Sequence, residues 1–163
     1  MCSNDYTYKI IDITEKFNDN SISNKREIVG VFHWTGGHRA NGAIDWLNKR
    51  RDGKGSVGYN YIIDRDGLVY MLAKPGSRWM HNTGLGTHFD ENTISISFAA
   101  LDENDSFTED QIESGKMLIK ELHKMFDVKW THHAKLNSHK QDFPEWFWEG
   151  LVIKLEIPRG SIL

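Results

Sequence analysis

The sequence predicts an α/β fold in which a central, mixed β-sheet is flanked by helices, within a single domain. Three observations support this prediction. The length of 163 residues fits one domain. Apolar segments rich in β-branched residues are mixed with segments of helical periodicity, which is typical of an α/β or α+β domain, and no internal repeat or low-complexity linker divides the chain. We expect the core to span residues 28–155 and an N-terminal extension to span residues 1–27.

A buried strand and a short helix are predicted at the start of the core. Residues 28–33 form an apolar run that ends just before a Gly-Gly pair, which is the pattern of a buried strand followed by a turn. Residues 43–51 place Ile44 and Leu47 on one side, and this spacing predicts a helix with one buried face.

A β-hairpin and a further strand are predicted next. Residues 57–63 are rich in β-branched and aromatic side chains, and residues 68–72 return after an Arg-Asp-Gly turn. Residues 93–99 alternate, so that isoleucine and phenylalanine point one way while Ser95 and Ser97 point the other. These serines are expected to face either solvent or a functional site.

The remaining part of the core is predicted to contain two helices joined by a loop. Thr108 and Gln111 form a capping-box pattern, and apolar residues then recur at helical spacing as far as Phe126. Residues 131–142 follow as a loop rich in histidine and lysine, and residues 145–155 form a final, aromatic-rich helix.

Composition argues against several classes of protein. The formal net charge is -3, whereas nucleic-acid-binding proteins usually carry a basic face, so we expect no nucleic-acid partner. The single cysteine, Cys2, allows no disulfide within the chain, which suits folding in a reducing cytosol. Residues 1–9 lack an apolar signal core, and no apolar run approaches the roughly 20 residues that span a bilayer. We therefore expect neither a signal peptide nor membrane insertion.

Histidines near two predicted strands are the candidate metal ligands. His33 stands at the end of the first buried strand, and His132 and His133 follow a short segment that is also a candidate strand. Asp142 comes ten positions after His132. Two imidazoles, one carboxylate and an open position for water form a common catalytic zinc set. The alternative interpretation is that the surface histidines are merely solvated and that His33 is a hydrogen-bonded core histidine.

Six segments in one order carry a family resemblance. They are residues 31–35 (VFHWT), 58–67 (GYNYIIDRDG), 79–81 (WMH), 92–97 (NTISIS), 107–111 (FTEDQ) and 132–142 (HHAKLNSHKQD). Together they resemble the type-2 N-acetylmuramoyl-L-alanine amidases, a family that includes phage lysozymes with amidase activity and the animal peptidoglycan-recognition proteins. The resemblance implies the fold of that family and a zinc-dependent hydrolase that cleaves the amide bond between N-acetylmuramic acid and L-alanine.

The same resemblance implies roles for individual residues. His33, His132 and Asp142 would bind one zinc ion per chain. Tyr59 would hydrogen-bond the developing oxyanion or the attacking water. Lys140 would stabilise negative charge in the tetrahedral state.

Four further residues are assigned to substrate binding. His81 and Asn92 would shape the substrate groove, and Trp34 and Ser97 are additional candidates. One branch of the family has glutamate as a general base at the position of Ser97, whose hydroxyl is too weakly basic to replace it near neutral pH. Either the zinc-bound water and Tyr59 suffice for catalysis, or activity is low.

The expected ligand loop departs from the family pattern. Phe143 separates Asp142 from Pro144, whereas the family has proline directly after the acidic ligand. His133 and His139 lie close enough in the sequence to be alternative ligands.

The sequence thus predicts a bacteriolytic peptidoglycan hydrolase of the phage endolysin type, with peptidoglycan or a muropeptide as its partner. The alternative is a non-catalytic peptidoglycan-binding module of the same fold, and a regulatory protein partner stays open as a further role. We expect a monomer that is cytoplasmic in the producing cell and acts on the cell wall after release or delivery.

Overall fold

The structure is a computed structural model that describes residues 8–17, 27–50, 58–75, 83–140 and 143–163. Within these residues, six strands form one mixed sheet in the order β1-β4-β3-β5-β2-β6. The strands are β1 (Ile10–Asp12), β2 (Glu27–Trp34), β3 (Tyr61–Ile63), β4 (Val69–Met71), β5 (Thr93–Phe98) and β6 (Asp127–His132). The helices are η1 (Thr14–Phe17), α1 (Ala40–Arg50), α2 (Thr87–Asp90), α3 (Glu109–Met125), α4 (His133–Leu136), α5 (Glu145–Lys154) and η2 (Arg159–Ser161). This arrangement confirms the predicted α/β fold class.

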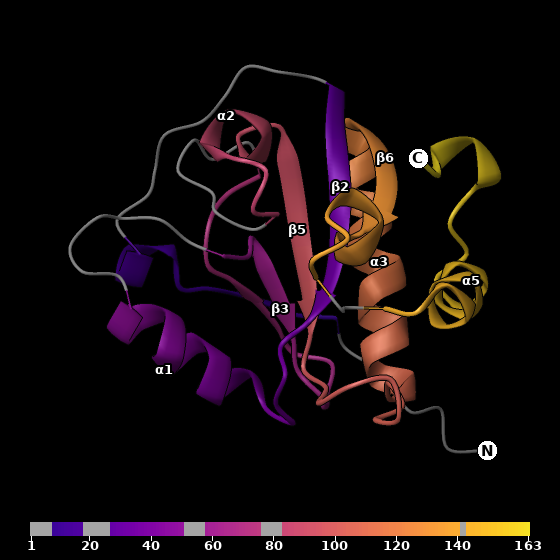
Figure 1. Ribbon diagram of the computed structural model, residues 1–163. Coiled ribbons are helices and arrows are strands. Elements are labelled where there is room, and N and C mark those ends of the chain that lie inside the picture. The colour runs from indigo at the N-terminus through magenta and orange to yellow at the C-terminus, as the bar shows by residue number, and fades with distance from the viewer. Residues whose placement is uncertain (1–7, 18–26, 51–57, 76–82, 141–142) are drawn as a thin grey trace, which may run out of the picture.

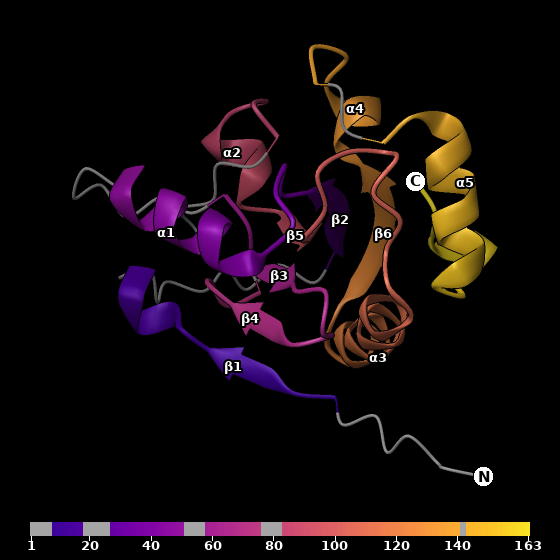
Figure 2. The same cartoon turned by 90° about the horizontal axis from the view of Figure 1, so that it is seen from below.

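Helices cover both faces of the sheet (Figure 1). α1 and α2 lie on one side, while α3 and α5 lie on the other, as the view from below also shows (Figure 2). β2 lies inside the sheet between β5 and β6 and runs parallel to both. Among the described strand pairs only β3 and β4 are antiparallel, and they form the predicted hairpin.

Each face of the sheet has its own hydrophobic core. The larger core lies against α3 and α5 and includes the fully buried rings of Phe32, Phe98 and Trp130. The smaller core lies against α1 and η1 and includes Phe17 and Ile44. Because both faces are covered, strands such as β5 are buried along their whole length.

The alternation of side chains along β2 decides which face each polar residue joins. Phe32 packs in the larger core, so the adjacent His33 points to the opposite face. Residues that are aligned in a parallel pair share a face. On β5, Ser97 is aligned with His33. On β6, His132 is aligned with Phe32, so His132 points toward the side of α3 and α5.

The predicted capping box begins α3 and also joins this helix to the sheet. The Thr108 hydroxyl accepts a hydrogen bond from the Gln111 backbone N at 3.1 Å, and the Gln111 amide oxygen accepts one from the Thr108 backbone N at 3.0 Å. The Gln111 side-chain amide also donates to the carbonyls of Ile63 and Ala99, both at 3.1 Å. Buried Gln111 therefore orients the long helix against β3 and β5.

Both ends of the described chain join the same sheet. In the segment assigned to an N-terminal extension, β1 pairs with β4 and Phe17 is fully buried. Near the other end, Ile162 forms a bridge with Trp130, and the Leu163 backbone N donates to the Trp130 carbonyl at 2.8 Å. The folded unit therefore draws on residues outside the range 28–155.

Two short helices lie in segments without a helical sequence pattern. α2 precedes β5, and α4 lies within residues 131–142, which were predicted as a loop. α4 follows β6 directly, so its first residue continues from the end of a sheet strand. None of the helices in the described segments is long and apolar enough to cross a lipid bilayer.

Candidate metal and substrate site

Two buried histidines meet at the end of β2. His33 and His133 are 1% and 6% exposed, and their Nδ1 atoms lie 3.0 Å apart. His33 is the penultimate residue of β2, and His133 is the first residue of α4, directly after β6. Because β2 and β6 are parallel neighbours, their carboxyl ends bring these two side chains together.

His132, the second predicted ligand, lies on the other face of the sheet. The centroid of its ring is 5.3 Å from that of Trp148, and its Nε2 lies 3.4 Å from a carboxylate oxygen of Glu145. Successive residues at the end of a strand point to opposite faces, so the step from His132 to His133 changes the face. The structure therefore differs from the expectation and places His133, the alternative ligand, beside His33.

The His133 ring is oriented by the main chain of another loop. Its Nε2 lies 3.1 Å from the carbonyl oxygen of Thr83, which can only accept a hydrogen bond. Neutral His133 therefore carries its proton on Nε2 and presents the Nδ1 lone pair toward His33. Metal-bound histidines usually donate their second ring N–H to a carbonyl or carboxylate in this way.

The spacing of the pair also suits a metal ion. Two imidazole nitrogens on one tetrahedral zinc, each bound at about 2.0–2.1 Å, are roughly 3.3 Å apart, close to the 3.0 Å between His33 and His133. Within the described segments, no group of three or more His, Cys, Asp or Glu side chains gathers as a metal site. Asp142, the third predicted ligand, and His81 lie outside the described residues. The two histidines therefore fit a metal as a pair that requires a further ligand.

Tyr59 lies beside the histidine pair, as its predicted role requires. The ring centroids of Tyr59 and His33 are 5.2 Å apart. The next residue, Asn60, is fully buried, and its side chain holds the main chain around Tyr59 through hydrogen bonds. The Asn60 amide donates to the Ala73 carbonyl at 3.2 Å, and its oxygen accepts from the Ser95 backbone N at 2.8 Å. These bonds fix the main chain that carries Tyr59.

A pocket of about 580 Å³ opens next to Tyr59. It is lined by residues 35–39 of the turn after β2, by Tyr59, and by residues of α1 that include Gly42 and Trp46. Trp46 is 55% exposed, so its indole ring offers a broad aromatic face to a ligand. Because Tyr59 borders both this pocket and His33, a ligand in the pocket would lie next to the histidine pair.

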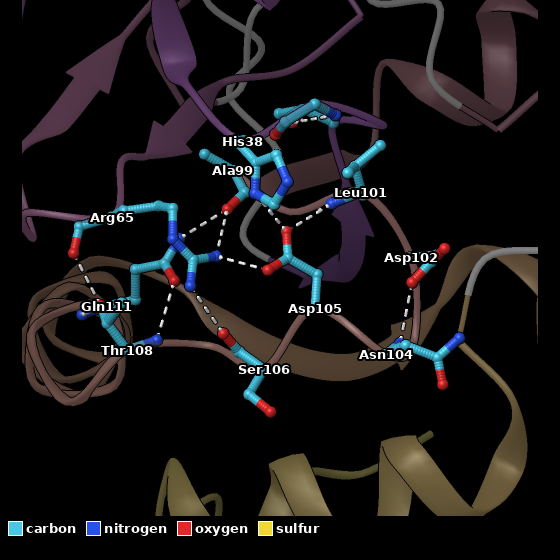
Figure 3. A network of polar contacts seen from close by, with 12 residues as sticks. His38, Arg65, Ala99, Leu101, Asp102, Asn104, Asp105, Ser106, Thr108 and Gln111 are labelled. Atoms are coloured by element: carbon cyan, nitrogen blue, oxygen red, sulfur yellow. Dashed lines mark hydrogen bonds and ion pairs between the residues drawn. The ribbon is translucent and has the colours of Figure 1, made fainter.

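A polar network supports one side of the pocket (Figure 3). The Nδ1 atom of pocket-lining His38 lies 2.9 Å from one carboxylate oxygen of Asp105, and the Arg65 guanidinium lies 3.1 Å from the other. Arg65 also donates to the Ser106 carbonyl at 3.0 Å, and Asp105 accepts from the Leu101 backbone N at 2.8 Å. The network ties the turn after β2 to the loop before α3. No local sequence pattern marks these contacts.

Two residues predicted to bind substrate lie inside the protein. Ser97 is aligned with His33 but is fully buried. Trp34 is 9% exposed, and its ring packs 4.9 Å from that of Phe143 in the larger core. The structure thus gives Trp34 a packing role and places Ser97 beside His33 on the neighbouring strand, away from solvent.

The main chain of two other predicted site residues is held by hydrogen bonds. Asn92 directly precedes β5, and its carbonyl accepts from the Val29 backbone N at 2.9 Å. Lys140 is exposed at the end of the segment that follows α4, and its backbone N donates to the Asn137 carbonyl at 2.9 Å. His139, an alternative ligand by sequence, is exposed as well.

A comparison with protein families identifies the family of the chain. The profile of the family described as N-acetylmuramoyl-L-alanine amidase matches residues 25–146, from just before β2 to the start of α5. The chain belongs to this family. The matched span of this amidase-family protein includes Tyr59 and both histidines of the pair. A search among curated proteins finds no match.

Solved structures share the amidase fold with this chain. N-acetylmuramoyl-L-alanine amidase LysC from Clostridium intestinale URNW is 21% identical, with 93% of this chain and 100% of that chain covered and a TM-score of 0.64. The Ph2119 endolysin from Thermus scotoductus MAT2119 bacteriophage Ph2119 is 18% identical, with 90% and 98% covered and a TM-score of 0.63. The ectodomain complex of peptidoglycan recognition proteins LCa and LCx bound to tracheal cytotoxin gives 16% identity, 88% and 94% coverage and a TM-score of 0.58. At these identities the similarity shows the fold alone.

Proposed function

We propose that this amidase-family protein is a zinc-dependent peptidoglycan amidase that cleaves the bond between N-acetylmuramic acid and L-alanine. The observation that supports the proposal most directly is the buried pair of His33 and His133, whose Nδ1 atoms approach to 3.0 Å. We assign these two histidines as zinc ligands and retain Asp142, from the sequence, as the third. This assignment exchanges His132 for His133, because His132 packs against Trp148 on the other face.

The residues around the pair suit amide hydrolysis. Zinc bound at such a site lowers the pKa of its water ligand to about 7 and polarises the carbonyl that is attacked. Tyr59, in ring contact with His33, has a hydroxyl that can donate to an oxygen that gains negative charge. Lys140, whose side chain is exposed, can balance that charge with its ammonium group. Ser97 is fully buried and too weakly basic to act as a general base.

We further propose that the pocket beside Tyr59 binds part of the peptidoglycan. The exposed ring of Trp46 offers an apolar face on which a sugar ring can pack. In support, solved proteins of this fold that are described as peptidoglycan recognition proteins bind tracheal cytotoxin. Trp46→Ala should raise KM for solubilised peptidoglycan with little change in kcat. Asn48→Ala, which changes an exposed residue of the same helix, should alter neither.

Metal content and wall lysis, measured together on four variants, test the ligand assignment. His33→Ala and His133→Ala should lose both bound zinc and lysis. His139→Ala changes an exposed histidine and should keep both. His132→Gln should lose stability but retain zinc in the folded fraction, because its ring packs in the larger core. Zinc retained by His133→Ala and lost by His132→Gln would reject the assignment.

The bond that is cleaved can be identified by mass spectrometry of digested peptidoglycan. An amidase releases stem peptides with free L-alanine amino ends and leaves the glycan intact. New reducing sugar ends would indicate a glycosidase and would contradict the proposal. The fold shared with a phage endolysin supports the further proposal that the chain acts on the bacterial cell wall as a lysin.

A non-catalytic peptidoglycan-binding module is the second candidate function. It is favoured by the absence of a glutamate at position 97 and by the peptidoglycan recognition proteins among the solved structures of this fold. Purified protein with no bound zinc, no product and tight muropeptide binding would support this alternative over the enzyme.

A further inference from the structure

We propose that Asp90 and Thr83 are positioning residues that set the ring orientation and tautomer of His133. The inference depends on the proposed function in one respect, since it treats His133 as a zinc ligand. The observation behind it is a chain of hydrogen bonds that leads from a buried carboxyl group to the His133 ring. None of these bonds lies within a strand ladder or a helix of the amidase fold.

The series of hydrogen bonds begins at Asp90, the last residue of α2, which is 1% exposed. One of its carboxyl oxygens accepts from the Thr83 hydroxyl at 2.5 Å and from the Thr83 backbone N at 3.3 Å. The main chain of Asp90 is also anchored, because its carbonyl accepts from the Thr93 hydroxyl at 2.8 Å. Burial of a carboxyl group is costly unless hydrogen bonds compensate, so both contacts to Thr83 stabilise this arrangement.

The carbonyl group of Thr83 links the buried Asp90 to the His133 ring. Thr83 is fully buried, and its carbonyl oxygen accepts from His133 Nε2 at 3.1 Å and from the Asn137 side-chain amide at 2.9 Å. His133 and Asn137 are four residues apart, so one turn of α4 brings both to the same oxygen. We call the Thr83 carbonyl and its two donors, His133 and Asn137, the clamp. A Cβ added at Gly84 would lie 2.9 Å from the Asn137 amide nitrogen, so the main chain approaches the clamp closely.

The clamp has a definite effect on His133. A neutral imidazole can carry its proton on either nitrogen, and only the Nε2–H form leaves Nδ1 free to bind a metal at the position facing His33. The Thr83 carbonyl selects that form, and Asp90 holds Thr83 in place. Loss of such an outer hydrogen-bond partner typically weakens metal binding by about 10- to 100-fold.

Two pairs of variants separate positioning from mere stabilisation. Asp90→Ala and Thr83→Val remove the hydrogen bond between the two side chains, whereas Asp90→Asn and Thr83→Ser retain an acceptor and a hydroxyl. Asp64→Ala is the matched control. Asp64 is a second buried aspartate that accepts from main-chain N–H groups, of Ala40 and Arg65, but its bonds do not lead to His133.

The first readout is the tautomer of His133 in the metal-free protein, measured from the ¹⁵N shifts of its ring at a pH where the ring is neutral. The wild type, Asp90→Asn and Thr83→Ser should show the Nε2–H form. Asp90→Ala and Thr83→Val should show a mixture of both forms. The second readout is the zinc Kd from competition with a chelator, which should rise about 10- to 100-fold in the same two variants.

The possible results are distinguishable. If Asp90→Ala does not fold, the measurements are made on Thr83→Val, in which the side-chain volume is nearly unchanged. An unchanged tautomer in Thr83→Val, or an equal loss of zinc affinity in Asp64→Ala, would overturn the inference. Wild-type protein that binds no zinc would refute the proposed function, while the tautomer measurement would still decide the role of the clamp.

Discussion

Replacing Asn60 by alanine should destabilise the protein more than most single substitutions. The side chain makes three hydrogen bonds, from its amide to the carbonyls of Ala73 at 3.2 Å and Lys74 at 3.0 Å, and from the Ser95 backbone N to its oxygen at 2.8 Å. With alanine, the buried Ser95 N–H and Ala73 carbonyl would each lose a partner, at about 1–3 kcal/mol apiece. The Lys74 carbonyl lies in a partly buried bond and would cost about 0.5–1 kcal/mol.

The expected loss is therefore about 2.5–7 kcal/mol, a large share of the roughly 5–15 kcal/mol that stabilises an ordinary domain. Urea unfolding should show it as a lower midpoint with an unchanged slope m. Asn48→Ala, on the exposed side of α1, is the control and should stay within about 0.5 kcal/mol of the wild type. A loss below about 1 kcal/mol for Asn60→Ala would refute the reasoning, because two buried main-chain groups cannot be left unpaired so cheaply.

Three other predictions follow from contacts in the core and from the proposed metal. A Cβ at position 30 would lie 2.1 Å from Cε3 of buried Trp130, so Gly30→Ala should cost about 1–3 kcal/mol in urea unfolding. Burial, with the nearby carboxylates of Glu121 and Asp12, raises the pKa of Tyr61. The neutral Tyr61 side chain therefore contributes stability that is complete below pH of about 10 and is lost as the pH rises, because an unfolded tyrosine ionises there. Between about pH 9 and pH 11, the unfolding free energy of Tyr61→Phe should fall less than that of the wild type. An equal fall in both proteins would contradict the link between Tyr61 ionisation and stability. Removal of zinc with a chelator should lower the Tm and abolish lysis, and added zinc should restore both. If the Tm stays unchanged after the loss of metal has been verified, zinc does not stabilise the folded state and the prediction is wrong.

Local patterns were sufficient to predict most of the sheet and the long helix. The Thr108 and Gln111 pair marked the start of α3, and the structure contains both capping bonds. β-Branched runs on either side of a short turn marked the hairpin of β3 and β4. The edge strand β1 has three residues, too few for its alternation to stand out from the surrounding polar chain. It is stabilised by its pairing with β4, which is a tertiary contact.

The alternation of side chains along β6 indicates which of the two neighbouring histidines, His132 or His133, lies beside His33. In β6, Val128 and Trp130 are fully buried core residues, so His132 continues the series that faces α3 and α5. The next residue, His133, necessarily joins the opposite face. The family resemblance pointed to His132, which the structure places on the face of the sheet opposite His33.

Other features of the site depend on contacts that no sequence pattern reports. The bond from His133 to the Thr83 carbonyl joins residues 50 positions apart, and it involves main chain on one side. The ion pair of His38 with Asp105 likewise joins two loops. Such contacts are set by how the loops at the ends of β2, β5 and β6 pack, which depends on the whole fold.

The last residues of the chain protect the strand that leads to the proposed metal site. Among the described strands β6 pairs with β2 alone, so its outer edge would otherwise present unpaired main-chain groups. Ile162 and Leu163 occupy part of that edge, and the Gly160 carbonyl accepts from the Lys129 ammonium at 2.6 Å. A shortened chain lacking residues 159–163 would expose a ready template for intermolecular strand addition. The exposed strand would be the one whose register determines which histidine faces His33.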